Sequence, residues 1–433
     1  MKDNIQEICG LPAKKLFKFA QKYLCVLINY FMKCIIIPFN FLIMKPFHKI
    51  AHRLPPSLQR LEYKLGIHYL RYYPFPRENP FIPESDKVII FFPGIGWDNM
   101  KQRHHHLPRA FVKAGWTAVY LTQDIEGDKV FGIKRIHERF FLCTNIKLLK
   151  NIKNPWIYMN YTFYMFYLHY FKEYRLIYDY LDKLEIHTFY NKKMVREHRK
   201  ALQIADIVMA SSTSLRDELI SIRKDTLLVP NAVFPEDFVY KKELNPPADL
   251  KYIVDQRKPV IGYYGIFSKW KIDYELLQRA AAKLPEYNFV LIGPDFDHSI
   301  QDYNWENFSN IYLLGKKKYE ELPDYAFFFD AAILPLLVNE ITNAISPVKL
   351  FEYFAMKLPV VSTGIAECRN FKSVLISQDH EDFIAKVRKA IKQKNDPAYL
   401  ALLQNDLARN TWDYRCKTIL EHMNGGQEKH TNQ

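Results

Sequence analysis

Cysteine is scarce in this 433-residue chain, and the few cysteines present are not paired. No Cys-x-x-Cys spacing occurs among the six: Cys9, Cys25, Cys34, Cys143, Cys368 and Cys416. Disulfide frameworks and structural zinc sites both need closely spaced or repeated cysteines. The pattern therefore favours a reducing, cytosolic compartment and predicts no structural metal.

Nucleic-acid-binding elements are also missing. The chain has no arginine-rich tract and no zinc knuckle, although its net charge is +14. The first 80 residues hold thirteen Lys and Arg against four Asp and Glu, so +9 of the +14 lies there. Charge concentrated at one end indicates contact with one anionic surface, and phospholipid headgroups suit it better than nucleic acid.

A long apolar run at residues 23–44 lacks the uniform composition of a membrane span. It contains Lys33, which costs roughly 2.5–3.5 kcal/mol near a bilayer centre, and Pro38, which interrupts a helix. We expect a helical, interfacial anchor at residues 1–82, with a true span or a hairpin packed on the protein as alternatives. No small-residue cleavage site follows, so a signal peptide is not expected. The predicted location is the cytoplasmic face of a membrane, such as a bacterial inner membrane, as a peripheral protein.

The remainder alternates short apolar runs with helical segments, as two α/β domains do. In a domain at 84–240, a strand and glycine turn at 86–97 precede a helix at 107–114. Further strands are predicted at 118–121, 156–159, 176–178, 207–210 and 227–229. A domain at 250–407 repeats the pattern, with strands at 260–264, 289–292, 311–314, 331–334 and 360–362. A final helix at 408–423 and a disordered tail at 424–433 follow.

Residues 346–363 are the most informative segment. Ser346 is a plausible N-cap and Pro347 a first helical residue, so a helix is predicted from Pro347. Apolar residues follow at helical spacing, and a β-branched run then predicts a buried parallel strand. The helix carries Glu352 in its second turn, where a carboxylate can enter a cleft.

Several motifs in these two domains resemble those of GT-B glycosyltransferases, most closely the retaining family 4, over residues 87–422. They are 204–208 (IADIV), 211–215 (SSTSL), 229–233 (VPNAV), 261–265 (IGYYG), 290–294 (VLIGP), Asp330 with Pro335, and 347–363. The resemblance implies two Rossmann-like domains facing across a cleft. The second would hold a nucleoside diphosphate sugar, the first would present the acceptor, and the last helix would cross back to the first domain.

The donor side of the predicted site comes from the second domain. In the resembling family the glutamate at Glu352 accepts hydrogen bonds from the ribose. Lys349 is a phosphate ligand or simply exposed, and one of Lys269 and Lys271 is expected to balance the diphosphate without a metal. Glycine after each strand allows close approach of the nucleotide, or serves as ordinary turn chemistry. The predicted donor-binding set is Gly265, Lys269, Lys271, Gly293, Asn343, Ser346, Lys349 and Glu352.

One expected donor residue is missing. The family has two glutamates separated by seven residues, and the first of these positions is occupied by Ala344. Because that glutamate contacts the donor sugar, the sugar cannot be named. Glu340, Thr342 and Asn343 lie on the same loop and are the candidate replacements.

The first domain supplies Arg103, His104 and Asp182 as catalytic candidates. Arg103 and His104 open a helix at the cleft edge or belong to a surface cluster. Consecutive histidines point about 100° apart, so the run 104–106 cannot hold one metal ion. Asp182 follows a strand end, as acidic residues do in the family, and a structural capping role for Asp179 or Asp182 is the alternative.

The expected function is metal-independent transfer, with retention, of a sugar from a nucleoside diphosphate sugar to a lipid-linked or glycan acceptor at an anionic membrane surface. No paired carboxylates at glycosidase separation are identifiable. A catalytically silent scaffold of polysaccharide assembly and a sugar-nucleotide epimerase are the alternatives. No cofactor is expected.

Overall fold

The computed structural model describes residues 77–78, 82, 87–98, 100–123, 125–128, 130–186, 190–239 and 245–425. The predicted anchor at residues 1–82, including its apolar run at 23–44, lies outside the described residues except for 77–78 and 82. Among the described residues, no helix is both long enough and apolar enough to cross a membrane. The same residues contain no group of three or more His, Cys, Asp or Glu that could hold a metal ion.

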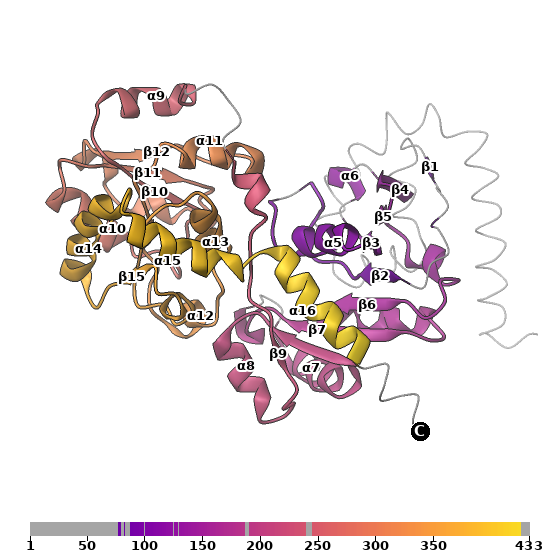
Figure 1. Ribbon diagram of the computed structural model, residues 1–433. Coiled ribbons are helices and arrows are strands. Elements are labelled where there is room, and N and C mark those ends of the chain that lie inside the picture. Colours follow the sequence, from indigo (N-terminus) through magenta and orange to yellow (C-terminus); the bar gives the residue numbers. More distant parts are fainter. Residues whose placement is uncertain are drawn as a thin grey trace, which may run out of the picture. The chain divides into compact units, whose positions relative to one another are not determined.

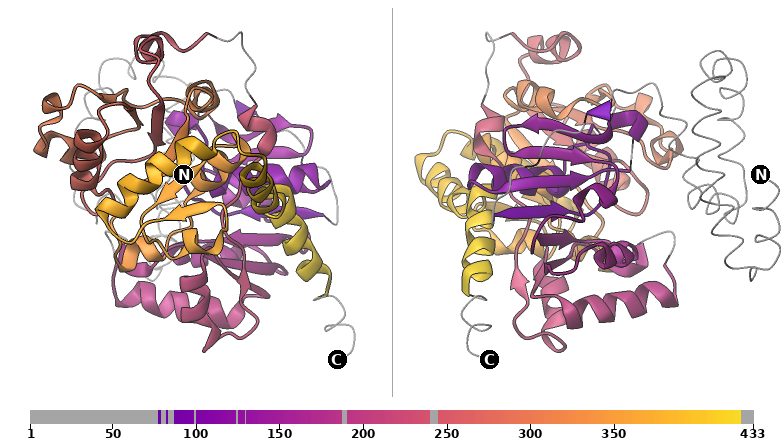
Figure 2. Two further views of the ribbon diagram at one scale, coloured as in Figure 1. Left: turned by 60° about the vertical axis from the view of Figure 1, so that its left-hand side comes forward. Right: turned by 90° about the vertical axis from the view of Figure 1, so that its right-hand side faces the viewer.

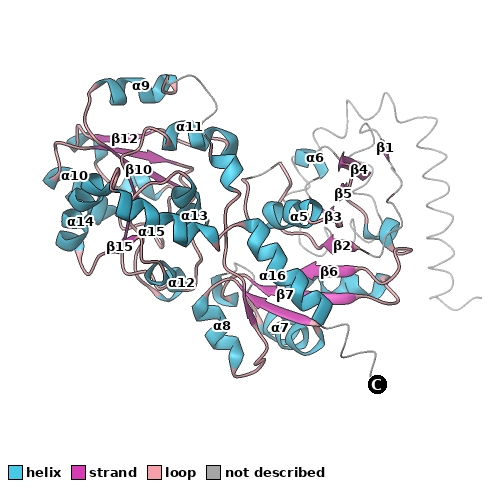
Figure 3. Ribbon diagram, in the orientation of Figure 1, coloured by secondary structure: helices cyan, strands magenta, loops and turns pink. Residues whose placement is uncertain are grey.

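The second domain is built on a six-stranded, fully parallel sheet with the strand order β12-β11-β10-β13-β14-β15. Strands β11 and β12 are added on one side of β10, and β13, β14 and β15 on the other. Sheets of this kind bind ligands at the point where the strand order changes sides. Its strands are β10 (Val260–Tyr264), β11 (Asn288–Ile292), β12 (Ile311–Leu313), β13 (Ala331–Leu334), β14 (Val360–Ser362) and β15 (Val374–Ile376). Its helices are α9 (Ala248–Asp255), α10 (Tyr274–Lys283), α11 (Leu322–Ala326), α12 (Glu340–Asn343), α13 (Val348–Ala355), α14 (His380–Gln393) and α15 (Pro397–Ala408). Figure 3 shows these helices flanking the strands.

The described residues of the first domain form a nine-stranded sheet with the order β1-β4-β5-β3-β2-β6-β7-β8-β9, and among these strands only the β4–β5 pair is antiparallel. Its strands are β1 (Arg77–Glu78), β2 (Val88–Phe91), β3 (Thr117–Leu121), β4 (Phe131–His137), β5 (Phe140–Cys143), β6 (Trp156–Met159), β7 (Arg175–Tyr180), β8 (Ile207–Ala210) and β9 (Leu227–Leu228). Its helices are α5 (Arg103–Lys113), α6 (Ile125–Asp128), α7 (Lys192–Ile204) and α8 (Thr213–Ile220) (Figure 1).

Each face of the first sheet has its own core because successive side chains of a strand point to opposite faces. Val88 and Ile90 of β2 belong to one buried cluster, whereas Ile89 and Phe91 belong to the other. Both faces are therefore apolar, which explains the continuous hydrophobic run that predicted this strand.

Some boundaries differ from the sequence prediction. Strands β1, β4, β5 and β15 were not predicted; β4 carries Lys134, Arg135 and His137, so its apolar pattern is weak. Helix α13 begins at Val348, with Pro347 as its N-cap and no side-chain cap, so the prediction of Ser346 as the cap is wrong. Ser346 Oγ instead accepts a hydrogen bond from the backbone N–H of Asn231 in the first domain.

The predicted C-terminal helix at 408–423 corresponds to α16 (Trp412–Gly425), which begins four residues later than predicted and is separated from α15 by a break at 409–411. After the break, the Trp412 N–H donates to the Val233 carbonyl, and α16 packs against α5. Both views in Figure 2 show α16 as the yellow helix that leaves the second domain. The Trp412 side chain is fully buried in a core of the first domain and stacks on His106.

We predict that Trp412→Ala lowers the free energy of unfolding by about 3–5 kcal/mol, because it leaves a large cavity under α16. Tyr414→Ala on the same helix is the control, since Tyr414 is 41% exposed; its effect should stay within about 0.5 kcal/mol. Urea unfolding followed by far-ultraviolet circular dichroism measures both. Equal losses in the two variants would contradict this role for Trp412.

Candidate functional site

A cleft of about 920 Å³ lies at the carboxyl ends of strands from both sheets. The second domain contributes the loops after β10 and β11 and the start of α13, and the first domain contributes the loop after β7. Pockets of this size suit a small organic ligand. Of the predicted site residues, eight line it: Arg103, Asp182, Gly265, Lys271, Gly293, Ser346, Lys349 and Glu352.

Two glycines of this cleft allow the loops after β10 and β11 to approach each other closely. Gly265 has φ 154° and Gly293 has φ 149°, conformations that L side chains rarely adopt. A Cβ atom on Gly293 would lie 1.7 Å from the Gly265 carbonyl oxygen, and one on Gly265 would lie 2.4 Å from Lys349 Nζ. Glycine at both positions therefore brings the Lys349 ammonium against the loop that follows β10.

Glu352 and Lys349 are oppositely charged groups on the first turns of α13. Glu352 is only 5% exposed, and burial raises the pKa of its carboxyl to about 7, against the opposing effect of Lys349. Burial and then the like charge of Lys271 lower the pKa of Lys349 to about 7, while Glu352 acts in the other direction. The cleft therefore holds a buried carboxyl group, that of Glu352, and a half-buried amino group, that of Lys349, on neighbouring turns of α13.

Lys271 and Asp182 approach the cleft from opposite domains and influence each other. Burial lowers the pKa of Lys271, and Asp182 opposes that shift. Burial raises the pKa of Asp182 to about 6, with Lys271 opposing and Asp179 adding to the rise. The cleft therefore has cations on its second-domain wall and a carboxylate on its first-domain wall.

Several cleft residues were missed from the sequence. Tyr264 and Tyr319 line the cleft, and the nearby Glu352 charge adds to burial in raising the pKa of both hydroxyls. The lysine run 316–318 also lines it, just beyond β12. The lysine run follows the carboxyl end of a predicted parallel strand, and this position could have indicated the site. Nothing in the sequence around the two tyrosines indicates that they line the cleft.

Two predicted donor residues lie elsewhere. Lys269 has a 72% exposed side chain, its Nζ is 3.8 Å from Asp302, and it does not line the cleft. Asn343 uses its Oδ1 to accept from the Ala366 N–H at 3.1 Å. Lys269 is exposed to solvent, and Asn343 is held by a hydrogen bond to the backbone. The structure therefore does not support a contact of either side chain with the cleft.

None of the candidate replacements for the missing glutamate reaches the cleft. Glu340 is 92% exposed and lies 3.8 Å from Lys183, and the Thr342 hydroxyl donates to the Leu337 carbonyl. Ala344 itself is 2% exposed and belongs to an apolar cluster of the first domain. The position that carries a sugar-binding carboxylate in the resembling family is an apolar contact here.

Arg103 is part of a buried ion pair. Its guanidinium lies 2.6 Å from Asp179 Oδ2 and also donates to the Val229 and Pro230 carbonyls at 2.8 and 3.3 Å. Arg103 and Asp179 are 2% and 0% exposed. This arrangement joins α5, β7 and the segment after β9, so Arg103 borders the cleft in a structural role, and Asp179 is its partner rather than a helix cap.

His104 does not face the cleft, so its prediction as a cleft-facing catalytic residue is wrong. Its ring is 2% exposed, hydrogen-bonds to the Asn160 amide, and packs where a Cβ on Gly94 would lie 2.1 Å away. Burial lowers its pKa to about 3, with His105 and Arg103 adding to the shift. The neighbouring His105 and His106 are also buried, so the alternative of a surface cluster is wrong as well.

We predict that Arg103→Met lowers the free energy of unfolding by about 3–5 kcal/mol, because Asp179 would remain buried without its cation. The double variant Arg103→Met/Asp179→Leu should recover at least half of that loss. Arg109→Met on the same helix is the control, since Arg109 is 41% exposed in its pair with Asp237; its cost should be at most about 1 kcal/mol. Chemical unfolding of the four proteins measures the free energy of unfolding of each. If the double variant recovers no stability, the ion-pair account is contradicted.

Comparisons with known proteins agree with this geometry. Residues 258–393 match the family described as glycosyl transferases group 1. A protein of Bacillus subtilis (strain 168), provisionally named teichuronic acid biosynthesis glycosyltransferase TuaH, is 27% identical over 254 residues, which are 56% of this chain and 62% of that protein. The chain therefore spans less than two thirds of the length of that relative.

Solved structures show the same fold. Sucrose-phosphate synthase from Thermosynechococcus elongatus is 16% identical and superposes with a TM-score of 0.58, covering 78% of this chain and 98% of that one. Anabaena Alr3699/HepE in complex with UDP and glucose is 14% identical with a TM-score of 0.59, covering 78% and 99%. The resemblance to group 1 glycosyltransferases and the two-domain GT-B fold are thereby confirmed.

Proposed function

We propose that the protein transfers a glycosyl unit from a nucleoside diphosphate sugar to a hydroxyl of a glycan or lipid-linked acceptor. The observation that carries the proposal is that Glu352 and Lys349 line the cleft together, with Lys349 beside Gly265, where the strand order of the second sheet changes sides. A carboxylate accepts two hydrogen bonds from vicinal ribose hydroxyls, and an ammonium one turn away suits a phosphate. Anabaena Alr3699/HepE, which shares the fold, was solved with UDP and glucose, which supports this reading.

The departing diphosphate needs positive charge that is already in place. Lys271 and Lys349 both line the cleft, and each has a pKa lowered by burial, so an incoming phosphate would restore the preferred charged form of both. We therefore propose that these two lysines balance the leaving group and that no metal is required. Retention of the anomeric configuration is proposed from the family resemblance.

Membrane attachment completes the proposal. The concentration of positive charge in residues 1–80 supports an interfacial contact with anionic lipid on the cytoplasmic side, where a lipid-linked acceptor would be reached. The relative TuaH is named for teichuronic acid biosynthesis, and this supports an acceptor of the cell envelope.

A silent scaffold remains a second candidate because Ala344 stands where a sugar-binding glutamate is expected and is buried in an apolar cluster. Such a protein would bind the nucleotide without turning over the sugar. Product analysis with labelled nucleotide sugars and membrane extract separates the two functions.

We predict that Glu352→Ala raises the Kd for the preferred nucleotide, UDP or GDP, about 10- to 100-fold, because hydrogen bonds to a charged group are lost. Glu340→Ala, which removes a carboxylate that is 92% exposed, is the matched control and should leave the Kd unchanged. Isothermal titration calorimetry measures all three proteins. An unchanged Kd in Glu352→Ala would show that Glu352 does not bind the nucleotide.

We also predict that binding of the nucleotide sugar is tightest near pH 7. Ribose hydroxyls favour deprotonated Glu352, so affinity should rise as pH increases through its pKa of about 7. The diphosphate favours protonated Lys349, so affinity should fall as pH increases through its pKa of about 7. Glu352→Gln should remove the acidic limb and Lys349→Met the alkaline limb of the profile. A flat profile from pH 5.5 to 8.5 in the unmodified protein would contradict the assignment.

A further inference from the structure

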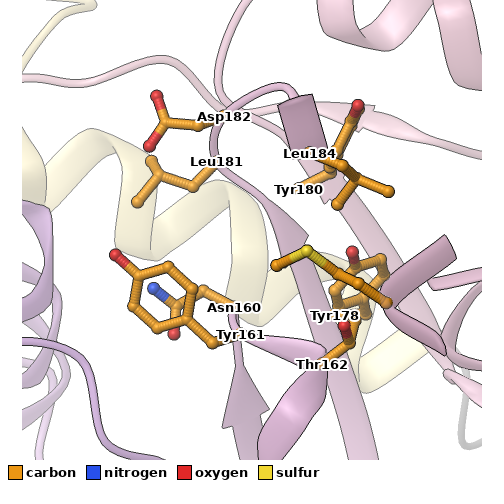
Figure 4. A pocket seen from close by; sticks show the side chains of 9 residues that line it. Asn160, Tyr161, Thr162, Tyr178, Tyr180, Leu181, Asp182 and Leu184 are labelled. Carbon is orange, nitrogen blue, oxygen red and sulfur yellow. The ribbon is translucent and has the colours of Figure 1, made fainter. Parts of the chain in front are cut away.

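A small recess opens from the first-domain wall of the cleft. It is lined by residues that follow β6, by the end of β7 and by α7, and it shares Leu181 and Asp182 with the large cleft. Figure 4 shows Leu181 and Asp182 on one side of the recess and Asn160, Tyr161 and Thr162 on the other. The space admits about one water-sized group.

Two buried polar side chains of this recess have an atom without a hydrogen-bond partner among the described residues. They are Asn160 Oδ1 and Thr162 Oγ1, on side chains that are 7% and 2% exposed. The other end of the Asn160 amide contacts His104 Nε2, which fixes the plane of the amide. Buried polar atoms without partners are uncommon in folded proteins and indicate a missing water or ligand group.

Two other hydroxyls that line the recess are already engaged. Tyr178 OH hydrogen-bonds to His198 Nδ1 at 2.7 Å, and Tyr180 OH donates to Glu218 Oε1 at 3.0 Å. Asn160 Oδ1 and Thr162 Oγ1 can therefore each receive a new group inside the recess, and Asp182 lines both the recess and the cleft.

We propose that this recess is an acceptor subsite that receives one hydroxyl of a sugar, with the neighbouring hydroxyl on Asp182; the inference rests on the proposed glycosyl transfer. A hydroxyl in the recess can donate to Asn160 Oδ1 or accept from the Thr162 hydroxyl, and either bond gives a partner to a buried polar atom that lacks one. A sugar ring carries hydroxyls on adjacent carbons, so a second one reaches the Asp182 carboxylate at the mouth. A phosphate is too large for the recess and would meet the charge of Asp182, so the acceptor group here is a glycan hydroxyl rather than a lipid phosphate.

This assignment also gives His104 a defined place. Because its pKa is about 3, the ring is neutral at physiological pH and holds the Asn160 amide through a hydrogen bond. His104 is thus a positioning residue for the acceptor, one side chain behind the recess, and it contributes no proton to the reaction.

The test uses the full chain with a labelled nucleotide sugar and membrane extract as the acceptor source, in three variants. Thr162→Val removes the hydroxyl, Thr162→Ser keeps it, and Met194→Phe fills the recess from α7. We expect the apparent acceptor KM to rise at least fivefold in Thr162→Val and to stay within twofold in Thr162→Ser, whereas Met194→Phe should reduce transfer at least tenfold. The Kd for UDP and the slow hydrolysis of the donor by water report on the donor half of the site, and neither should change in the variants. The melting temperature reports on folding.

Two results would overturn the inference. If the unmodified protein transfers sugar and all three variants keep its acceptor KM, the recess holds only a structural water. If transfer to a glycan-free polyprenyl phosphate occurs and is insensitive to Thr162→Val, the acceptor group is a phosphate. Failure of the proposed function is different, since the unmodified protein itself would then turn over no nucleotide sugar, and the acceptor subsite would be lost with it.

Discussion

Burial of opposite charges on one turn of α13 is the constraint on which the rest of the site depends. Glu352 and Lys349 lie three residues apart, and each is shifted towards neutrality by loss of water. The helix can hold them there because its other face, including Leu350 and Phe354, is buried in the second-domain core. The apolar face stabilises the packing of the helix. The charged face can bind a ligand whose polar groups replace the water that these side chains have lost.

Contacts between the domains place the first-domain wall opposite this turn. Asn231 hydrogen-bonds through its N–H and side chain to Ser346, two residues before α13, and Glu367 accepts from the Thr213 N–H. The buried Arg103–Asp179 pair holds the segment that contains Asn231 by binding the Val229 and Pro230 carbonyls. Helix α13 and the first-domain wall of the cleft are therefore linked through hydrogen bonds between described residues.

The sequence predicted the parts that depend on periodicity and strand ends. Apolar runs located most strands, and because parallel strands end at one edge, Gly265, Lys271, Gly293 and Glu352 were expected together and do line one cleft. Arg103 and His104 could not be placed, since burial of a charged helix start depends on Asp179 and Asn160, which are 76 and 56 residues away. The recess could not be predicted either, because the lack of a partner for the Thr162 hydroxyl results from packing and produces no pattern in the sequence.

The most direct measurement is an experimental structure of the full chain with bound UDP. The account predicts that both ribose hydroxyls contact Glu352 and that the diphosphate lies between Gly265 and the ammonium groups of Lys271 and Lys349. A nucleotide bound elsewhere, or one whose ribose leaves Glu352 unpaired, would contradict it.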